Sequence, residues 1–260
     1  MWHYVDAGAG PPLILLHGIG MSHAAWNPVM GYLSQTRRVI AFDIAGLGST
    51  PPLPRGTPPS IPNLVDGLDR SVRALGLPLP IDIAGNSLGG YMALEAAKRG
   101  MARSVVAISP AGLWKTNPPP HVKTLFACLR SSAKHFPNVL KTLLRNPAMR
   151  ELAFAVPLSV GSRRMTADDA TRVIDDLTAT AAFEETFEQT RSPFSGRDIT
   201  TPVTVAFGTR DWVLPGPSRF RSGLPPHARW IDVGGWGHVP MWADPIGVSQ
   251  LILESTAVSR

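Results

Sequence analysis

The stretch "IAGNSLGGYM", residues 83–92, places one serine, Ser87, between glycines where an apolar run meets a helical pattern. A Gly-x-Ser-x-Gly sequence between a strand and a helix is typical of a strained turn that lifts a serine above a sheet edge. Gly85 and Gly89 would remove side chains that collide in such a turn, and the helix N-terminus favours developing negative charge. Ser87 is therefore either a nucleophile or only the N-cap of a helix, and the motif alone leaves both open.

Further apolar runs predict the sheet that carries this turn. Six runs have the length and composition of strands buried on both faces: 12–18, 38–46, 81–87, 104–112, 202–211 and 228–238. Helical patterns lie between them at 22–34, 63–75 and 88–99. Because strands and helices alternate, the sequence predicts an α/β protein with a doubly wound, mostly parallel sheet.

The alternation stops between residues 115 and 200, where amphipathic stretches replace the buried runs. The insertion is too long for an ordinary connection between two strands. We expect residues 1–114 and 201–260 to form the core of the domain and residues 115–200 to form a helical lid. The lid would cover the C-terminal ends of the strands, where open α/β sheets bind ligands.

Composition restricts the class of protein. A chain of 260 residues with 44% hydrophobic and 17% charged residues can bury a sizeable core. The single cysteine, Cys128, excludes an intrachain disulfide and a multi-cysteine metal site, and we expect its side chain to be buried. No apolar stretch approaches the ~20 residues that span a bilayer, and the N-terminus lacks a signal-peptide pattern. These features predict a cytoplasmic protein.

Charge gives one further indication. The net charge is +6, but the basic residues are scattered singly, without zinc-finger or helix-turn-helix spacing, so no nucleic-acid partner is expected. One local bias stands out, because residues 115–150 contain seven basic residues and no acidic residue. This bias fits a solvated helix face, attraction of an anionic substrate, or attraction of a membrane surface.

A serine nucleophile needs a base to take its proton, and His238 is the best-placed histidine. It lies in "GGWGHVPMWADP", a glycine-rich loop after the last apolar run. Asp211, just past another buried run in "VAFGTRDWVLP", would hold one imidazole tautomer and stabilise the imidazolium. The rival acids fit other roles: 175–176 suits a solvated lid helix and Asp244 suits a helix N-cap. The order Ser87, Asp211, His238 is that of hydrolases with this type of turn.

The loop "LLHGIGMSHAAW" (15–26) follows the first apolar run and can hold an anion. The N–H groups of Ile19 and Leu88 would form a two-donor oxyanion hole, in which each donor contributes about 3–4 kcal/mol. "GIGMSHA" (18–24), followed by Asp43, also fits a dinucleotide-binding fingerprint. A dinucleotide site would leave the serine turn and the histidine loop without a role.

The segments "LLHGIG", "DIAGLGST", "GNSLGG", "FGTRDWVLP" and "GHVPMWADP", in this order, resemble the α/β-hydrolase fold superfamily over nearly the whole chain. The resemblance implies a mostly parallel sheet of about eight strands with a helical lid inserted between strands six and seven. It also implies that Ser87, Asp211 and His238 form a catalytic triad, with Ile19 and Leu88 as oxyanion donors. An aspartate in place of Ser87 would have indicated a dehalogenase or an epoxide hydrolase.

We therefore predict a serine hydrolase that cleaves a carboxylic ester or thioester of a small, largely apolar molecule through an acyl-enzyme. Pocket candidates near the catalytic loops are Met21, Trp114, Trp212 and Val239, and neither a metal nor an organic cofactor is implied. "GNSLGG" is also similar to the turn of carbon–carbon hydrolases acting on ring-cleavage diketones, which commonly carry Trp where Val239 stands. A cofactor-free perhydrolase and a ligand receptor that retains the triad are also compatible with these motifs.

Overall fold

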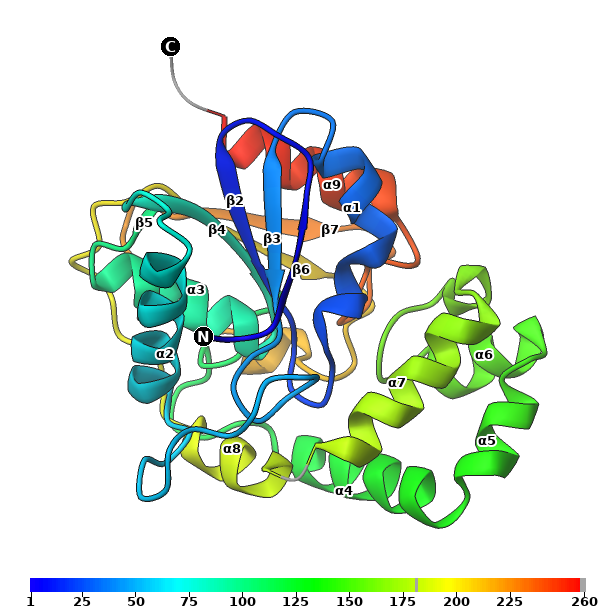
Figure 1. Cartoon of the computed structure of the whole chain (residues 1–260). Coiled ribbons are helices and arrows are strands. Elements are labelled where there is room, and N and C mark those ends of the chain that lie inside the picture. The colour runs from blue at the N-terminus through cyan, green and yellow to red at the C-terminus, as the bar shows by residue number, and fades with distance from the viewer. Residues whose placement is uncertain (181, 258–260) are drawn as a thin grey trace.

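The computed structural model describes residues 1–180 and 182–257, and these form a sheet with helices on both faces (Figure 1). The described residues contain seven strands: β1 (Tyr4–Ala7), β2 (Pro12–Leu16), β3 (Arg38–Phe42), β4 (Ile81–Asn86), β5 (Ala102–Ile108), β6 (Val203–Gly208) and β7 (Arg229–Val233). Their order in the sheet is β1-β3-β2-β4-β5-β6-β7. β1 runs antiparallel to β3, and the other neighbours are parallel.

All six predicted strands form, and each ends earlier than the apolar run that predicted it. The residues past each strand end leave the sheet as loops at its C-terminal edge. The seven strands of the described residues fit the expected sheet of about eight, a number that came from the family resemblance and not from runs in this sequence. β1 was not predicted from the sequence, because Val5 and Asp6 at its centre are exposed, as is usual in an edge strand, and form no apolar run.

Helices cover both faces of the sheet (Figure 1). α2 (Ile61–Ala74) and α3 (Leu88–Lys98) lie on one face, and α1 (Asn27–Leu33) and α9 (Pro245–Ser255) lie on the other. The predicted helix at 22–34 begins as a 3-10 turn, η1 (His23–Trp26). Successive strand residues point to opposite faces, so Ile14 packs in the core under α2 and α3, and Leu13 packs under α1 and α9.

Between β5 and β6 the chain forms a helical insertion, here residues 115–200. It contains α4 (Pro120–His135), α5 (Pro137–Leu143), α6 (Pro147–Phe154), α7 (Ala167–Ala179), α8 (Phe183–Gln189) and the 3-10 turn η2 (Ser162–Arg164). The insertion follows the fifth strand and not the sixth, because one strand fewer precedes it than the resemblance implied. Figure 1 shows α4 to α7 projecting beyond the core, past one end of the strands.

The burial predicted for Cys128 is wrong, because its side chain is exposed on α4. Phe126 and Leu129 on the same helix line a cavity beneath the insertion. At about 100° per residue, Cys128 lies about 200° from Phe126, on the opposite side of the helix. The apolar composition of the segment predicted a helix correctly, but it did not reveal the phase of that helix relative to the core.

Candidate active site

β4 and α3 meet in a sharp turn at Ser87, which has φ 54° and ψ −113°. Such a positive φ is strained for a non-glycine residue, and the turn is held because Ser87 N–H donates to the Ile108 carbonyl at 3.0 Å. A Cβ at Gly89 would lie 2.1 Å from the carbonyl oxygen of Leu16, and one at Gly85 would lie 2.1 Å from that of Gly89. Both glycines are therefore required by backbone contact.

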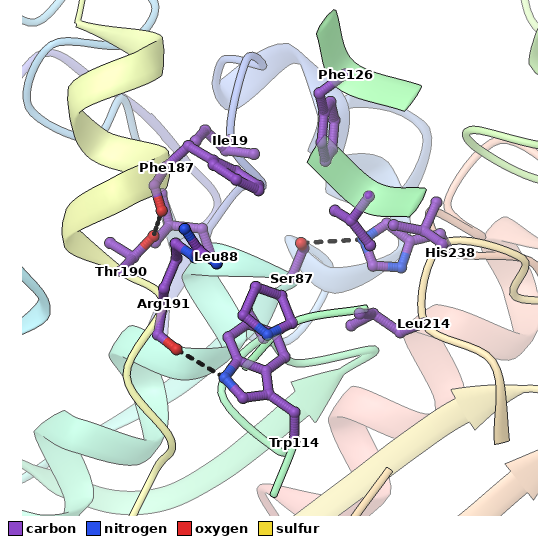
Figure 2. A pocket seen from close by; sticks show the side chains of 14 residues that line it. Ile19, Ser87, Leu88, Trp114, Phe126, Phe187, Thr190, Arg191, Leu214 and His238 are labelled. Carbon is purple, nitrogen blue, oxygen red and sulfur yellow. Dashed lines mark hydrogen bonds between the residues drawn. The ribbon is translucent and has the colours of Figure 1, made fainter. Parts of the chain in front are cut away.

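Ser87, His238 and Asp211 come from three different loops and meet at the C-terminal edge of the sheet. His238 Nε2 is 3.0 Å from Ser87 Oγ (Figure 2), and His238 Nδ1 is 3.1 Å from Asp211 Oδ2. Ser87, His238 and Asp211 are only 8%, 4% and 3% exposed, respectively. The structure thus brings together the three residues that the sequence singled out, while their catalytic roles stay a prediction.

Asp211 is held as a carboxylate. Its Oδ1 accepts hydrogen bonds from the N–H groups of Val213 at 3.0 Å and Leu214 at 2.9 Å, and Arg219 Nη2 lies 3.9 Å from Oδ2. Burial alone would raise the pKa of the Asp211 carboxyl, but His238, the Leu214 N–H and Arg219 outweigh it and hold that pKa below its usual range. A carboxylate on Nδ1 leaves Nε2 free to accept the serine proton.

Asn86 anchors the loop that carries His238, and sequence reasoning gave it no role. Its side-chain amide donates to the carbonyls of Ile108 at 3.1 Å and His238 at 2.8 Å. On the other side of the loop, Val239 N–H donates to the Leu158 carbonyl of the insertion at 2.9 Å. In the sequence, only the position of Asn86 beside Ser87 could have indicated a role. That position places Asn86 at the end of β4, next to the neighbouring loops.

The N–H groups of Ile19 and Leu88 are available to a ligand. Neither donates a hydrogen bond to any part of residues 1–180 or 182–257. Both residues line a cavity together with Ser87. The loop carrying Ile19 lies close to the serine, since a Cβ at Gly18 would be 3.4 Å from Ser87 Cβ. The oxyanion hole therefore stays a prediction with suitable geometry.

Asp43 does not serve a dinucleotide. Its buried carboxylate accepts hydrogen bonds from the N–H groups of His23 at 2.6 Å and Ser49 at 2.9 Å, and the rings of His3 and His23 lie within 2.9 Å. Burial would raise the pKa of this carboxyl, but the bonds from His23 and Ser49 outweigh it and lower that pKa. With its oxygens engaged, Asp43 joins three loops and cannot reach a ribose.

Two cavities meet at Ser87, and both are also lined by Ile19, Phe126 and His238. The larger has about 270 Å³ of free volume, and the smaller has about 40 Å³. Met21, Val239 and apolar side chains of α4 to α7 line the larger one, among them Leu129, Leu140, Phe154, Val173 and Leu177. Trp114, Thr190, Arg191 and Leu214 line the smaller one (Figure 2). Three of the four predicted pocket residues thus lie at a cavity.

Trp212 does not line either cavity, so its prediction is wrong. Its side chain is 59% exposed. Asp211 turns inward, where its carboxylate accepts the N–H groups two and three residues ahead, and this turn directs the adjacent side chain outward. The Trp212 carbonyl lies 3.2 Å from Nε2 of His121, at the start of α4. The residue therefore contacts the insertion through its backbone.

One partly buried carboxyl, that of Asp176, joins the insertion to the core and predicts a pH-dependent stability. Ser22 Oγ donates to Asp176 Oδ2 of α7 at 2.5 Å, and burial raises the pKa of Asp176. The folded state then holds a proton that the unfolded chain has lost, so stability falls as pH rises above the unfolded carboxyl pKa of ~3.9. We expect Asp176→Asn to raise the Tm at pH 7 by ~2 °C and to give no gain at acidic pH. Thermal unfolding across pH measures this, and a lower Tm at pH 7 would contradict it.

A serine hydrogen-bonded to a histidine–aspartate pair, at the edge of a doubly wound sheet, is the arrangement typical of hydrolases that use a serine nucleophile. Residues 13–251 match the Alpha/beta hydrolase family, and the chain belongs to this family of enzymes. The predictions of the fold and of an enzyme are thereby confirmed.

Known relatives have several activities. The chain is 30% identical over 198 residues to an epoxide hydrolase from Mycobacterium tuberculosis, covering 73% of this chain and 91% of the relative. Its fold is similar to that of a meta-cleavage product hydrolase from Pseudomonas fluorescens, with a TM-score of 0.73, 23% identity, and coverage of 97% and 92%. It is also similar to a carboxylesterase from Bacillus subtilis, with a TM-score of 0.72, 22% identity, and coverage of 97% and 86%. At these sequence identities, similarity to the two structures is evidence for the fold alone.

Proposed function

We propose that this enzyme cleaves a carboxylic ester or thioester through an acyl-enzyme on Ser87. The observation that carries the proposal is the 3.0 Å contact between Ser87 Oγ and His238 Nε2, with Asp211 behind the imidazole. In this mechanism His238 takes the serine proton as Oγ attacks the carbonyl carbon, and the N–H groups of Ile19 and Leu88 hold the oxyanion. His238 then protonates the leaving alcohol or thiol, and later activates the water that releases the acid.

We further propose that residues 115–200 act as a lid on a core of residues 1–114 and 201–260. Supporting this, the insertion supplies most of the residues that line the larger cavity, while loops of the sheet supply Ser87 and His238. The apolar wall favours a small, largely apolar substrate. At ~30 Å³ per water-sized group, the larger cavity takes an acyl or alcohol chain of roughly nine non-hydrogen atoms.

Ser87 argues against epoxide hydrolysis, the activity named for the mycobacterial relative. A serine that opened an epoxide would form an ether, which water activated by His238 does not cleave. The same serine attacking a carbonyl forms an ester, which is hydrolysed by the second half of the mechanism. Only the ester intermediate can be hydrolysed to return the free enzyme, so this site favours acyl transfer over epoxide opening.

A carbon–carbon hydrolase acting on a ring-cleavage diketone is the second candidate. One feature favours it, because Arg191 lines the smaller cavity and its buried Nε has no hydrogen-bond partner within the described ranges. An acidic diketone would bring a carboxylate to such a group. Against it, Val239 stands after His238 where these hydrolases commonly carry Trp. A perhydrolase and a ligand receptor are outcomes of the same test.

A substrate panel separates these candidates. It contains p-nitrophenyl esters of increasing acyl length, acyl thioesters, a vinylogous diketone, and a carboxylic acid with hydrogen peroxide. We expect multiple turnovers with the esters or thioesters. Faster cleavage of the diketone would transfer the assignment to carbon–carbon hydrolysis, and peracid formation at a higher rate would transfer it to a perhydrolase. Tight binding without turnover would identify a receptor.

A variant of α5 tests which of the two cavities holds the longer acyl chain of the substrate. Leu140 lines the larger cavity, so Leu140→Trp is expected to lower kcat/KM for the longest ester by about tenfold and to leave the acetyl ester unchanged. The matched control is Leu143→Trp on the same helix, because Leu143 is exposed. An equal loss of kcat/KM for all esters would contradict the proposal that the larger cavity holds the acyl chain of the substrate.

A further inference from the structure

Exposed apolar side chains gather on one part of the insertion. Of the eleven large apolar side chains exposed in residues 1–180 and 182–257, five lie between residues 136 and 156 and are 47% to 77% exposed. They are Phe136, Val139, Leu143, Leu152 and Val156. Single exposed apolar residues are ordinary, whereas a cluster of this kind marks an interaction surface. We call these five residues the outer patch.

Three residues of the outer patch lie on α5 and α6, and both helices also supply side chains that line the larger cavity. On α5, Leu140 lines the cavity, while Val139 and Leu143 are exposed, and the helix has no fully buried residue. On α6, Phe154 lines the cavity, and Leu152 lies about 200° away from it around the helix. Both helices therefore carry apolar side chains that line the cavity and apolar side chains that are exposed to the surroundings.

The charges around the outer patch are positive. Lys134 and Arg145 flank the exposed residues of α5, are themselves exposed, and form no salt bridge with any described acidic residue. No acidic residue occurs in 115–150. Of the nearby acids, Asp175 pairs with Lys141, and Glu151 accepts backbone N–H groups at the η2 turn and keeps its charge. Glu184 is close enough to Lys134 for that ammonium group to lower the pKa of its carboxyl. The patch thus combines apolar side chains with a basic border.

We propose that the outer patch binds the surface of an anionic lipid bilayer. Apolar side chains that enter the headgroup boundary and basic side chains that meet anionic lipids are the two terms of such binding. In the described ranges no helix is long and apolar enough to cross a membrane, so the contact is at the surface. A symmetric dimer through this patch is disfavoured, because it would bring the basic borders of two copies close together.

Lipid binding does not depend on the proposed ester hydrolysis, but it would serve it. The helices α5 and α6 form part of the wall of the larger cavity, so a molecule dissolved in the bilayer would lie next to that cavity. An apolar substrate would then pass from lipid to Ser87 with little exposure to water. This last step rests on the proposed function, whereas the binding does not.

Co-sedimentation with vesicles tests the proposal. We expect the full chain to bind vesicles of phosphatidylcholine mixed with phosphatidylglycerol about tenfold more tightly than vesicles of phosphatidylcholine alone, and added salt to remove the difference. The double variant Leu143→Asp/Leu152→Asp is expected to lose binding to the mixed vesicles by at least about tenfold. The matched control is Ile246→Asp, which changes an exposed apolar residue of α9 and is expected to bind like the wild type.

Three outcomes would overturn the proposal. Equal sedimentation with both lipid mixtures, absence of binding, or a loss of binding in Ile246→Asp equal to that of the double variant would each do so. A wild-type dimer that the double variant converts to a monomer, without lipid binding, would assign the patch to a second copy. Because neither Leu143 nor Leu152 lines a cavity, unchanged hydrolysis of a soluble short ester by the double variant shows that it is folded.

Discussion

Replacing Ser87 with alanine is expected to lower kcat for the preferred ester by about 10⁶-fold, because no other group can take its place in the acyl-enzyme. His238 and the oxyanion donors lose their function together with the serine, so removing one member removes nearly the whole effect. Steady-state release of p-nitrophenol measures the loss. Labelling with a fluorophosphonate, followed by peptide mapping, is expected to modify Ser87 in the wild type only.

Ser109 provides the matched control for this variant. It is the other non-glycine residue with positive φ among the described residues, it is fully buried, and its Oγ has no hydrogen-bond partner there. Ser109→Ala is expected to keep both activity and labelling, since Ser109 does not contact the histidine. Persistent fluorophosphonate labelling of Ser87→Ala, or full turnover by this variant, would contradict a mechanism in which Ser87 is the nucleophile.

Replacing Asp211 with asparagine is expected to lower kcat by about 10⁴-fold with little change in fold. The reason lies in the two N–H groups of Val213 and Leu214, which both point at Oδ1. They keep the amide oxygen of an asparagine on their side, so its NH₂ group takes the place of Oδ2, 3.1 Å from His238 Nδ1. Nδ1 must then accept, and the proton moves to Nε2, where it prevents the imidazole from receiving the serine proton.

Asp232 serves as the control for charge near this site. Its Oδ1 lies 3.8 Å from Nη1 of Arg219, the arginine that also lies near Asp211. The Asp232 side chain is exposed, however, and it is not hydrogen-bonded to His238. Asp232→Asn is expected to leave kcat within about twofold of the wild type, since a solvated charge contributes little. A loss in Asp211→Asn no larger than that in Asp232→Asn would show that Asp211 does not orient the histidine.

The relation between sequence and structure differs between the core and the insertion. The core strands could be predicted because a strand buried on both faces must be apolar throughout, which leaves a local record in the sequence. The Gly18 loop, Ser87 and Asp211 each follow such a run, whereas His238 follows β7, a partly exposed edge strand, and parallel strands bring those ends to one edge. Edge strand β1, which is half exposed, left no such record.

The insertion was less predictable, because its helices pack through contacts that its composition does not reveal. Arg130 illustrates this, since the basic bias of 115–150 fitted a solvated helix face. Its guanidinium is instead buried, donating to the Leu177 carbonyl at 2.6 Å and the Thr180 carbonyl at 3.1 Å. It joins α4 to the end of α7, and only the folded chain places those carbonyls beside it.

The sequence by itself therefore determined the family, six of the seven described strands, and the residues Ser87, Asp211 and His238 that meet at the sheet edge, because local patterns and parallel topology are sufficient for them. Tertiary structure alone decided the two cavities, the outward position of Trp212 and the anchoring of His238 by Asn86. These features depend on distances between segments far apart in the chain, and the phase of each helix against its neighbours sets those distances.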